Sequence, residues 1–300
     1  MTGAAGFVGS RVTRALAEAG LDVHAAVRRD AGPRLAGVEG IRLERCDLAD
    51  PIAVAELVAR VEPELCIHCA WIATPGAYLT SPENATHERI AANLALRLVE
   101  RGCARIVGVG TCFEYAPSDE PLRETSPLRP TTPYARAKLA ALACMQDACE
   151  GSPTTLAWAR LFYLYGPGED QRRLVPSVVL SLLEGRPART TPGEQLRDFL
   201  HVDEVATALV AVARSDVTGS VNVGAGHSVP VRELVETLGR ITGRPDLVDL
   251  GALPYAPDDP MVVSADTRRL TEECGFMQRR TLEDGLSETV RWWSARRDPR

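Results

Sequence analysis

A tyrosine and a lysine four residues apart, Tyr134 and Lys138 in the stretch TPYARAKLA, are the side chains of this sequence best suited to chemistry. On a helix these two positions share one face. A neighbouring ammonium favours the phenolate, and a phenol with its ordinary pKa of about 10 needs that help to transfer protons near neutrality. The spacing also arises by chance on helix surfaces, but here Pro133 begins the helix, and a strand ending in Gly110-Thr111 precedes Tyr134 by 23 residues. We therefore predict a proton-transferring pair.

A glycine-rich turn, MTGAAGFVGS, opens the chain directly before a helical pattern. Its three glycines allow a tight bend, a close approach of the backbone to a pyrophosphate, and close packing of helix and sheet. The helix N-terminus adds free N–H groups and a partial positive charge. The turn predicts a dinucleotide site with coenzyme contacts from Gly3, Gly6, Phe7, Val8 and Gly9.

The identity of the coenzyme depends on the end of the next strand, VHAAVRRD. An acidic residue there would bind the adenosine ribose of NAD, but Val27 takes that position, and Arg28 and Arg29 follow it. Guanidinium groups suit a 2′-phosphate, so the sequence favours NADP(H), while NAD(H) stays possible. Two solvated arginines are the alternative interpretation. Asp47 and Leu48, after the third strand, are expected to meet the adenine edge.

The strand that should precede this turn is missing from the sequence, because Met1 stands where it would end. In a doubly wound fold that strand is central, and its loss would leave unpaired backbone groups on two buried strands. We therefore expect the first strand to be truncated here and the natural chain to begin upstream of Met1.

The composition of the 300 residues, with 25% charged residues and a net charge of −6, is that of a globular protein and argues against nucleic acid as a partner. No apolar run reaches the length of about 18 residues needed for a membrane span, and no export signal is recognisable, so we expect a cytoplasmic protein with reduced cysteines and no membrane partner.

Cys66 and Cys69 of ELCIHCAW lie on a predicted strand, where residues three apart face opposite sides, so we interpret them as core residues. His201 is expected before an acidic helix start, and His24, His87 and His227 at the periphery. No histidine is spaced for a metal with another histidine or cysteine, and no metal is expected.

Strand-like and helix-like segments alternate up to about residue 165, which predicts an α/β fold of Rossmann type, with a doubly wound parallel sheet covered on both faces. Residues 1–165 would form the dinucleotide-binding domain, with 198–222 returning to it, and 166–300 would be mainly a smaller α/β substrate-binding region. The expected strands are 21–27, 41–47, 64–70, 104–111 and 154–164, and the expected helices are 7–20, 51–61, 82–102 and 134–149. Helices 203–213 and 281–296 are expected to pack on the first domain.

Motifs along nearly the whole chain resemble the extended short-chain dehydrogenases/reductases of the nucleotide-sugar epimerase/dehydratase type. They are TGAAGFVG, CDLAD, CIHCA, the helix bearing Asn93, GVGTCFEY, PYARAK, RLFYLYGPG, RDFLHVDEVA, VNVGAG and LEDGLSETVRWW. The resemblance implies that Thr111 bonds the reacting sugar oxygen, that Tyr134 is the acid/base, and that Lys138 holds the nicotinamide ribose. It also implies a coenzyme contact from Ala70, a structural role for Asn93, and a homodimer built on helices 82–102 and 134–149.

Three departures from the family pattern bear on the substrate. Dehydratases carry an acidic pair after the threonine, whereas Cys112 and Phe113 follow it here, which argues against dehydration. Tyr163 takes the place of an asparagine that usually meets the substrate phosphate. Ala256 lies near the expected place of an arginine that clasps a diphosphate, while Arg197 keeps its counterpart. The expected substrate contacts are Thr111, Cys112, Phe113, Tyr163 and Arg197.

The sequence thus favours NADPH-dependent reduction of a keto group on a nucleotide-activated deoxysugar. GTCFEY and RLFYLYGPGE resemble 4-keto-6-deoxysugar reductases, and an epimerase would retain a tightly bound coenzyme, usually NAD. The alternatives are an NAD-dependent nucleotide-sugar 4-epimerase, a reductase of a non-sugar carbonyl compound, and a dinucleotide-sensing protein without activity.

Overall fold

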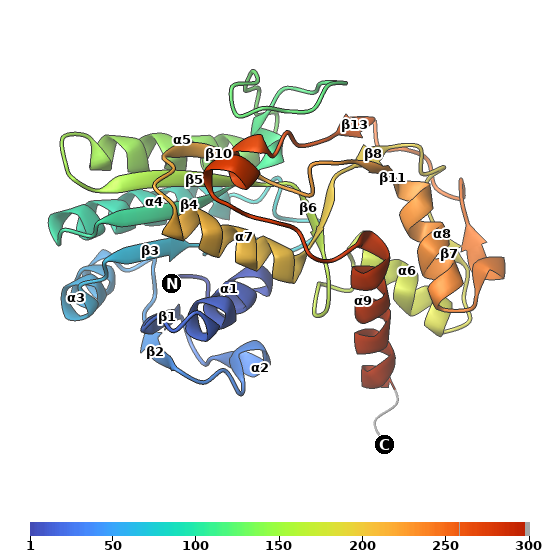
Figure 1. Cartoon of the computed structure of the whole chain (residues 1–300), viewed down its shortest axis with the longest axis horizontal. Helices are drawn as coiled ribbons and strands as arrows, with labels where there is room; N and C mark the ends of the chain where they lie inside the picture. The colour runs from blue at the N-terminus through green and yellow to red at the C-terminus, as the bar shows by residue number, and fades with distance from the viewer. Residues whose placement is uncertain (258, 298–300) are drawn as a thin grey trace.

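The computed structural model describes residues 1–257 and 259–297, and its first half alternates helices and strands as the sequence predicts (Figure 1). Local signals set several boundaries: Pro51 begins α3, and the Asp50 side chain accepts hydrogen bonds from the amides of Ile52 and Ala53. The elements are α1 (Phe7–Glu18), β1 (Val23–Val27), α2 (Gly32–Leu35), β2 (Ile41–Arg45), α3 (Pro51–Val61), β3 (Leu65–His68), α4 (Glu83–Glu100), β4 (Arg105–Thr111), η1 (Cys112–Glu114), α5 (Pro133–Cys149) and β5 (Thr155–Leu161).

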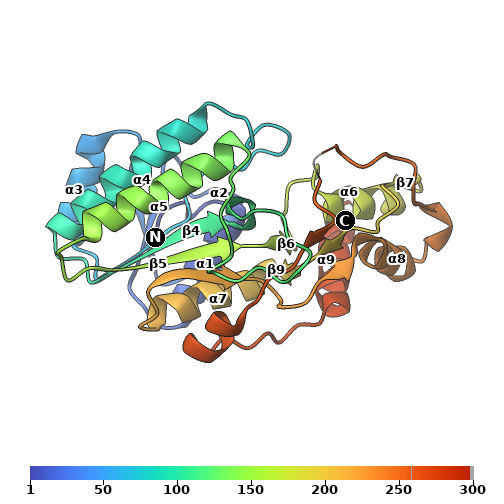
Figure 2. The ribbon, with the colours of Figure 1, turned by 90° about the horizontal axis from the view of Figure 1, so that it is seen from above.

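The main sheet is parallel and has helices on both faces (Figure 2). β2 pairs with β1, and β3, β4, β5 and β10 (Gly219–Val223) follow one another. Thr2 bridges the two groups through Ala26 and His68, which gives the order β2-β1-Thr2-β3-β4-β5-β10. α1 and α7 (Val202–Arg214) pack in one hydrophobic cluster, and α3, α4 and α5 pack in the cluster on the other side. The predicted doubly wound α/β sheet is confirmed.

The first strand is reduced to Met1 and Thr2. The Thr2 amide donates to the Ile67 carbonyl at 3.0 Å, and the Ala26 amide donates to the Met1 carbonyl at 2.8 Å. Behind these residues, between β1 and β3, lies a cavity of about 400 Å³ lined by apolar side chains such as Val23 and Leu94 and by polar ones such as His24 and Glu44. That the natural chain begins upstream of Met1 stays a prediction.

Most of the chain beyond β5, apart from α7, β10 and η3, forms a smaller lobe beside the sheet (Figure 2). The segment expected as one strand, 154–164, is divided, because β6 (Tyr163–Tyr165) leaves the main sheet and pairs with β9 (Phe199–His201). The other elements are α6 (Leu174–Leu183), β7 (Ala188–Arg189), β8 (Leu196–Arg197), β11 (Val229–Pro230), α8 (Val231–Ile241), η2 (Pro245–Leu247), β12 (Val248–Asp249), β13 (Val262–Val263), η3 (Arg269–Glu273) and α9 (Leu282–Arg297).

The closing helix α9 packs differently from the prediction. α7 does pack on α1 in the core of the first domain, but α9 buries Leu286, Val290 and Trp293 in the cluster of the smaller lobe, against α6 and α8. The prediction for 281–296 was therefore wrong, since its apolar face matches neighbours that are distant in sequence.

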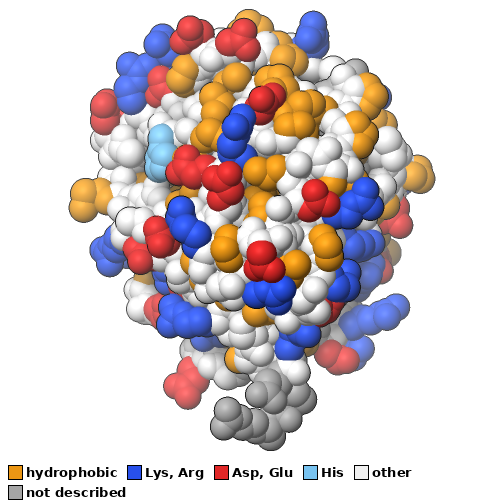
Figure 3. Space-filling model, turned by 90° about the vertical axis from the view of Figure 1, so that its right-hand side faces the viewer, with side chains coloured by type: hydrophobic (Ala, Val, Ile, Leu, Met, Phe, Trp, Pro, Cys, Tyr) orange, Lys and Arg blue, Asp and Glu red, His pale blue; other side chains and the backbone are white. Residues whose placement is uncertain are grey.

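The surface at the end of the smaller lobe is mixed in character, and the cysteines are not paired. On the end of the smaller lobe, acidic and basic side chains are interspersed with hydrophobic ones (Figure 3). Among the described residues, every helix is too short or too polar to cross a membrane. The eight cysteines are all free, with Cys66 buried on β3 and Cys69 half-buried just after it, as expected of core residues.

Candidate active site

Helix α5 presents the tyrosine and lysine to the carboxyl end of β4. Its start is fixed by Pro133 in the first turn and by the Thr132 side chain, which accepts a hydrogen bond from the Ala135 amide at 3.1 Å. Lys138, one turn after Tyr134, is 3% exposed, and its Nζ donates to the Val109 carbonyl of β4 at 2.6 Å. Lys138 therefore faces the sheet rather than solvent, and Tyr134 is half-buried.

Thr111, the last residue of β4, meets Tyr134. The Thr111 side chain caps the short helix η1 by accepting from the Phe113 amide at 3.3 Å. Burial raises the pKa of the Tyr134 phenol, and a side-chain hydrogen bond with Thr111 opposes that shift. The phenol is thus held in its protonated form beside the Thr111 hydroxyl in the ligand-free protein.

Lys138 has an aromatic neighbour that the sequence analysis missed. Its Nζ lies 3.7 Å from the ring centroid of Trp71, whose indole N–H donates to the side-chain oxygen of Asn84 at 2.9 Å. His87 stacks on the same indole with ring centroids 5.4 Å apart, so the prediction that His87 is peripheral was wrong. Burial lowers the pKa of Lys138 to about 7, although the Glu114 carboxylate opposes the shift. Trp71 follows the end of β3 at the same sheet edge, a position that could have marked it.

A second aromatic ring missed by the sequence analysis, that of Tyr78, lies edge-on to Tyr134, with ring centroids 5.0 Å apart. The loop that carries Tyr78 also holds the start of α5, because the Leu79 carbonyl accepts from the Tyr134 amide at 3.1 Å. Arg173, from the smaller lobe, lies 4.8 Å from the Tyr78 ring centroid. The loop therefore links the proton-transferring pair to the second lobe.

The opening glycines lie against the ends of the central strands. Gly3 has φ +68°, and a Cβ there would lie 2.7 Å from the Ala70 amide nitrogen. A Cβ on Gly9 would collide with the Gly3 carbonyl oxygen. Gly6 is the N-cap of α1 and has no side chain to cap the helix, so the amides of the first turn, which includes Phe7 and Val8, are left to a ligand or to water.

The residues expected at the adenosine end follow the next two strands. Arg28 and Arg29 are exposed directly after β1, and Asp47 is exposed after β2. The Asp47 carboxylate accepts from the Ala49 amide at 3.1 Å and so shapes the turn, whereas Leu48 packs against the core under α3 and α4. All four lie beyond the carboxyl ends of their strands, where doubly wound sheets bind ligands.

The expected substrate contacts form a neighbouring group. Cys112 is buried beside Thr111, and the Phe113 and Tyr163 rings meet edge to face with centroids 6.2 Å apart. The guanidinium of Arg197 lies 5.3 Å from the Tyr163 ring centroid. Ala256 is exposed, and the charged partner of Arg197 is instead Asp259, at 2.6 Å, an acid that the sequence analysis did not single out.

Beneath Thr111 lies a buried ion pair that sequence reasoning also missed. Glu114 is fully buried and accepts from the Thr111 amide at 3.0 Å, from the Trp158 indole N–H at 3.1 Å and from Arg160 Nε at 2.6 Å. Arg160 also donates to the Tyr115 hydroxyl at 3.0 Å. The carboxylate thus points into the core and fixes the backbone that carries Thr111.

Asn93 lies on α4, and its Nδ2 is buried without a hydrogen-bond partner among the described residues.

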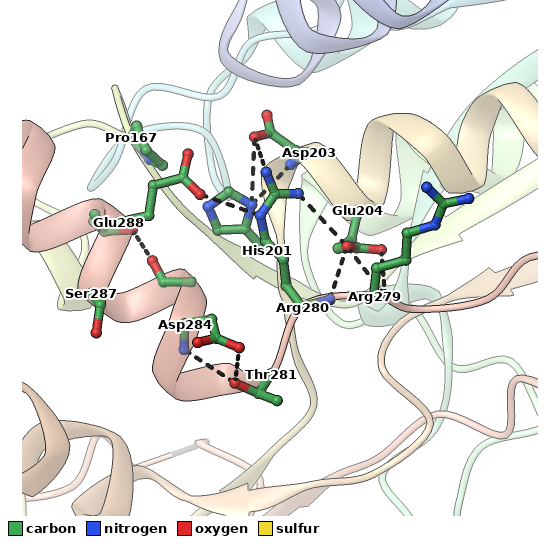
Figure 4. Close-up of polar contacts among 12 residues, drawn as sticks. Pro167, His201, Asp203, Glu204, Arg279, Arg280, Thr281, Asp284, Ser287 and Glu288 are labelled. Atoms are coloured by element: carbon green, nitrogen blue, oxygen red, sulfur yellow. Dashed lines mark hydrogen bonds and ion pairs between the residues drawn. The ribbon is translucent and has the colours of Figure 1, made fainter.

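A polar cluster joins α7 of the first domain to α9 of the smaller lobe (Figure 4). Asp203 pairs with Arg11 at 3.2 Å and with Arg280 at 3.4 Å, and Arg280 also pairs with Glu288 at 3.2 Å. His201 accepts from the Asp203 amide at 3.3 Å, and burial lowers its pKa. Although His201, Asp203 and Glu288 bring ligand atoms within 4.8 Å of one another, the two guanidinium groups already neutralise the acids. We interpret the cluster as a structural link.

Comparisons with known proteins agree with this fold. The model of the NAD dependent epimerase/dehydratase family matches residues 1–224. The UDP-glucose 4-epimerase of Streptomyces lividans is 29% identical, with 98% of this chain and 95% of that protein covered. The dTDP-glucose 4,6-dehydratase of Streptomyces griseus is 28% identical, with 99% and 94% covered. The solved structure of MoeE5 in complex with UDP-glucose and NAD is 28% identical, with a TM-score of 0.85 and 99% and 98% of the two chains covered.

The chain therefore belongs to the NAD dependent epimerase/dehydratase family, as the sequence motifs indicated. It is an enzyme of the extended short-chain dehydrogenase/reductase type. Its relatives include both epimerases and dehydratases, so family membership leaves the reaction of this chain to be argued from its own residues.

Proposed function

We propose that this enzyme transfers a hydride between a nicotinamide coenzyme and a sugar carbon of a nucleotide-activated sugar, and that it works as a reductase of a keto group. The observation that carries the proposal is the placement of Tyr134 and Lys138, one turn apart on α5, at the carboxyl end of β4, where Lys138 Nζ donates to the Val109 carbonyl and Thr111 ends the strand. A hydroxyl, a phenol and an ammonium at one point suit the reduction of a carbonyl, which needs a proton where an alkoxide forms.

The opening turn supports the binding of a dinucleotide. A Cβ at Gly3 would fill the space beside Ala70, and a Cβ at Gly9 would collide with the Gly3 carbonyl. The first turn of α1 lacks a capping side chain. These features fit a pyrophosphate, which the amides of Phe7 and Val8 would bind. When bound, the nicotinamide ring supplies or accepts the hydride.

Each of the three central residues then has a distinct role in the proposal. The Thr111 hydroxyl binds and orients the substrate oxygen. Tyr134 holds a proton on its phenol oxygen and donates it to the oxygen as the carbonyl is reduced. Lys138 supplies positive charge and orients the coenzyme ribose, and Trp71 limits how far its ammonium can move.

The coenzyme specificity that we propose is for NADP(H). Arg28 and Arg29 are exposed after β1, with Val27 in the place of an acidic ribose ligand, which suits a 2′-phosphate. The solved relative MoeE5 is in complex with NAD, so the competing expectation is NAD. A direct comparison of the two coenzymes decides between them.

A 4-epimerase is the second candidate function. It is favoured by the relatives named UDP-glucose 4-epimerase, and it would use the same three residues. Dehydration is disfavoured, because the two residues directly after Thr111 are the buried Cys112 and Phe113, which packs on Tyr163, and neither carries a carboxylate to remove a proton. The next residue, Glu114, is buried against Arg160. For the assembly, we keep the prediction of a homodimer through α4 and α5, which lie side by side on one face (Figure 2).

The reaction can be tested by supplying dTDP- and UDP-activated 4-keto sugars with NADPH or NADH and following coenzyme absorbance. We expect NADPH consumption, and we expect Tyr134→Phe to lower kcat by about 10²–10⁴-fold because the general acid is lost. Tyr255→Phe, which alters a hydroxyl bonded to Glu194 in the smaller lobe, is the matched control. Interconversion of UDP-glucose and UDP-galactose with retained NAD⁺ and no net coenzyme consumption would establish the epimerase instead.

A further inference from the structure

The side chains of Arg197 and Gln195 both donate hydrogen bonds to the carboxylate of Asp259. Arg197 is 3% exposed and Gln195 is 5% exposed. Arg197 Nη2 donates to Asp259 Oδ1 at 2.6 Å, and Gln195 Nε2 donates to Asp259 Oδ2 at 3.1 Å. Each oxygen of the carboxylate therefore receives a hydrogen bond from a side chain that is more than nine-tenths buried.

The two donors are held independently of the acid that they bind. Arg197 Nη1 donates to the Leu196 carbonyl at 2.9 Å, and β8, which carries Arg197, pairs with β11 on one side and with β13 on the other. Asp259 belongs to no strand, and its side chain is 30% exposed. If the carboxylate left, the guanidinium and the amide would keep their places and present a cradle for another anion.

This cradle adjoins the proposed substrate pocket. The Arg197 guanidinium lies 5.3 Å from the Tyr163 ring centroid, and Tyr163 meets Phe113 two residues after Thr111. A buried guanidinium without a counter-ion is costly, so the ligand-free protein needs an anion at this place. Asp259 provides it.

We propose that Asp259 takes the place of a phosphate of the substrate in the ligand-free enzyme, and that a nucleoside diphosphate displaces it to bind Arg197 and Gln195. The inference rests on the proposed function, since it assigns the diphosphate end of that same site. The diphosphate of a nucleotide sugar carries two charges and more acceptor oxygens than a carboxylate, and it suits the planar guanidinium equally well. The exchange therefore selects doubly charged groups over neutral ones.

The proposal makes Asp259 a competitor of the substrate, which separates it from a residue that only orients Arg197. Removing a competitor tightens binding of the diphosphate, whereas removing an orienting partner weakens it. The two roles therefore predict opposite signs for one measurement.

The test is titration calorimetry of UDP, dTDP, inorganic pyrophosphate and uridine against the wild type and Asp259→Asn. The asparagine keeps the shape of the side chain and removes its charge. Asp246→Asn is the matched control, because Asp246 pairs with Arg244 at 3.3 Å on the surface of the same lobe. We expect Asp259→Asn to bind UDP and dTDP about tenfold more tightly, a change of about 1.4 kcal/mol. Uridine binding and the control variant should be unchanged.

The melting temperature of the same variant provides a second test. Without ligand, Asp259→Asn should melt at a lower temperature than the wild type, because Arg197 loses its counter-ion, and UDP should raise its melting temperature more than that of the wild type.

Equal or weaker binding of UDP by Asp259→Asn overturns the proposal, and so does the absence of any phosphate binding by the variant. Failure of the proposed function looks different. In that case pyrophosphate would bind the variant more tightly, yet neither protein would turn over a nucleotide sugar with any coenzyme.

Discussion

Replacing Glu114 with glutamine should destabilise the protein more than any change at a surface ion pair. Glu114 and Arg160 are 0% and 2% exposed, and Glu114 also accepts from the Thr111 amide and the Trp158 indole. A glutamine oxygen can keep one or two of these hydrogen bonds, but its amide end faces Arg160 Nε, donor against donor. Arg160 is then a buried cation whose remaining acceptors, the Tyr115 hydroxyl and the Glu124 carbonyl, are both neutral.

The size of the effect follows from that geometry. Breaking a buried pair by removing one partner costs about 3–5 kcal/mol, and part of the hydrogen bonding survives in glutamine, so we expect a loss near the lower end, about 3 kcal/mol. For a chain of this size that corresponds to a fall in Tm of about 6–12 °C. Urea or guanidinium unfolding followed by circular dichroism measures the free energy directly.

Two comparisons make this result interpretable. Glu100→Gln breaks the exposed pair with Arg97 and should change the free energy of unfolding by less than about 1 kcal/mol. Glu114→Gln combined with Arg160→Met removes both charges and should recover part of the lost stability. A loss of less than about 1 kcal/mol in Glu114→Gln, or no recovery in the double variant, would refute the assignment of Glu114 as the counter-ion of a buried arginine. Because the Thr111 amide is bonded to Glu114, kcat should also fall more than KM changes.

Three further changes probe the site. Burial lowers the pKa of Lys138 to about 7, so kcat/KM should fall as the pH rises through about 7. Lys138→Met should abolish that inflection, and a wild-type profile that is flat across it would contradict the ammonium role. The unfolded chain keeps this proton up to about pH 10.5, so the free energy of unfolding should gain a contribution from Lys138 as the pH rises between these two values. Gly9→Ala should abolish coenzyme binding, measured by NADPH fluorescence, because the added Cβ collides with the Gly3 carbonyl oxygen. In Gly6→Ala the added Cβ would lie 3.1 Å from the same oxygen, so this variant should weaken coenzyme binding less. Equal losses of binding in the two variants would argue against the steric reason. Arg28→Ala with Arg29→Ala should weaken NADPH binding about tenfold and leave NADH binding unchanged, and equal losses for both coenzymes would exclude a 2′-phosphate contact.

Local signals explain why much of the fold was predictable from the sequence. Asp50 and Pro51 mark the start of α3 by chemistry that acts within three residues. Tyr134 and Lys138 share a face because they are one turn apart, and Thr111 ends an apolar strand that the residue types identify. The doubly wound sheet follows from the order of such segments, because parallel strands require helical crossovers.

Contacts between distant segments explain what the sequence did not reveal. Asp259 meets Arg197 across 62 positions and Glu114 meets Arg160 across 46, and neither acid differs in type from solvated neighbours such as Glu120. Trp71 and His87 were missed because their stacking depends on how the loop after β3 returns over α4. The position of α9 was wrong for the same reason, since an amphipathic helix does not specify which lobe it covers.

Arg197 and Lys138 are buried cations that the chain neutralises in different ways, and that difference bears on how substrate and coenzyme would be bound. Arg197 has a carboxylate at 2.6 Å, so in our proposal an arriving phosphate exchanges with an existing partner. Lys138 has a carbonyl oxygen and the face of Trp71 as its nearest partners, and its lowered pKa means that its charge depends on what lies beside it. An anionic ligand next to Lys138 therefore favours the ammonium that the reaction needs, whereas the same ligand at Arg197 only replaces one anion by another. In this proposal, binding of an anion beside Lys138 adds a positive charge to the protein, whereas binding at Arg197 leaves the charge of the protein's side chains unchanged.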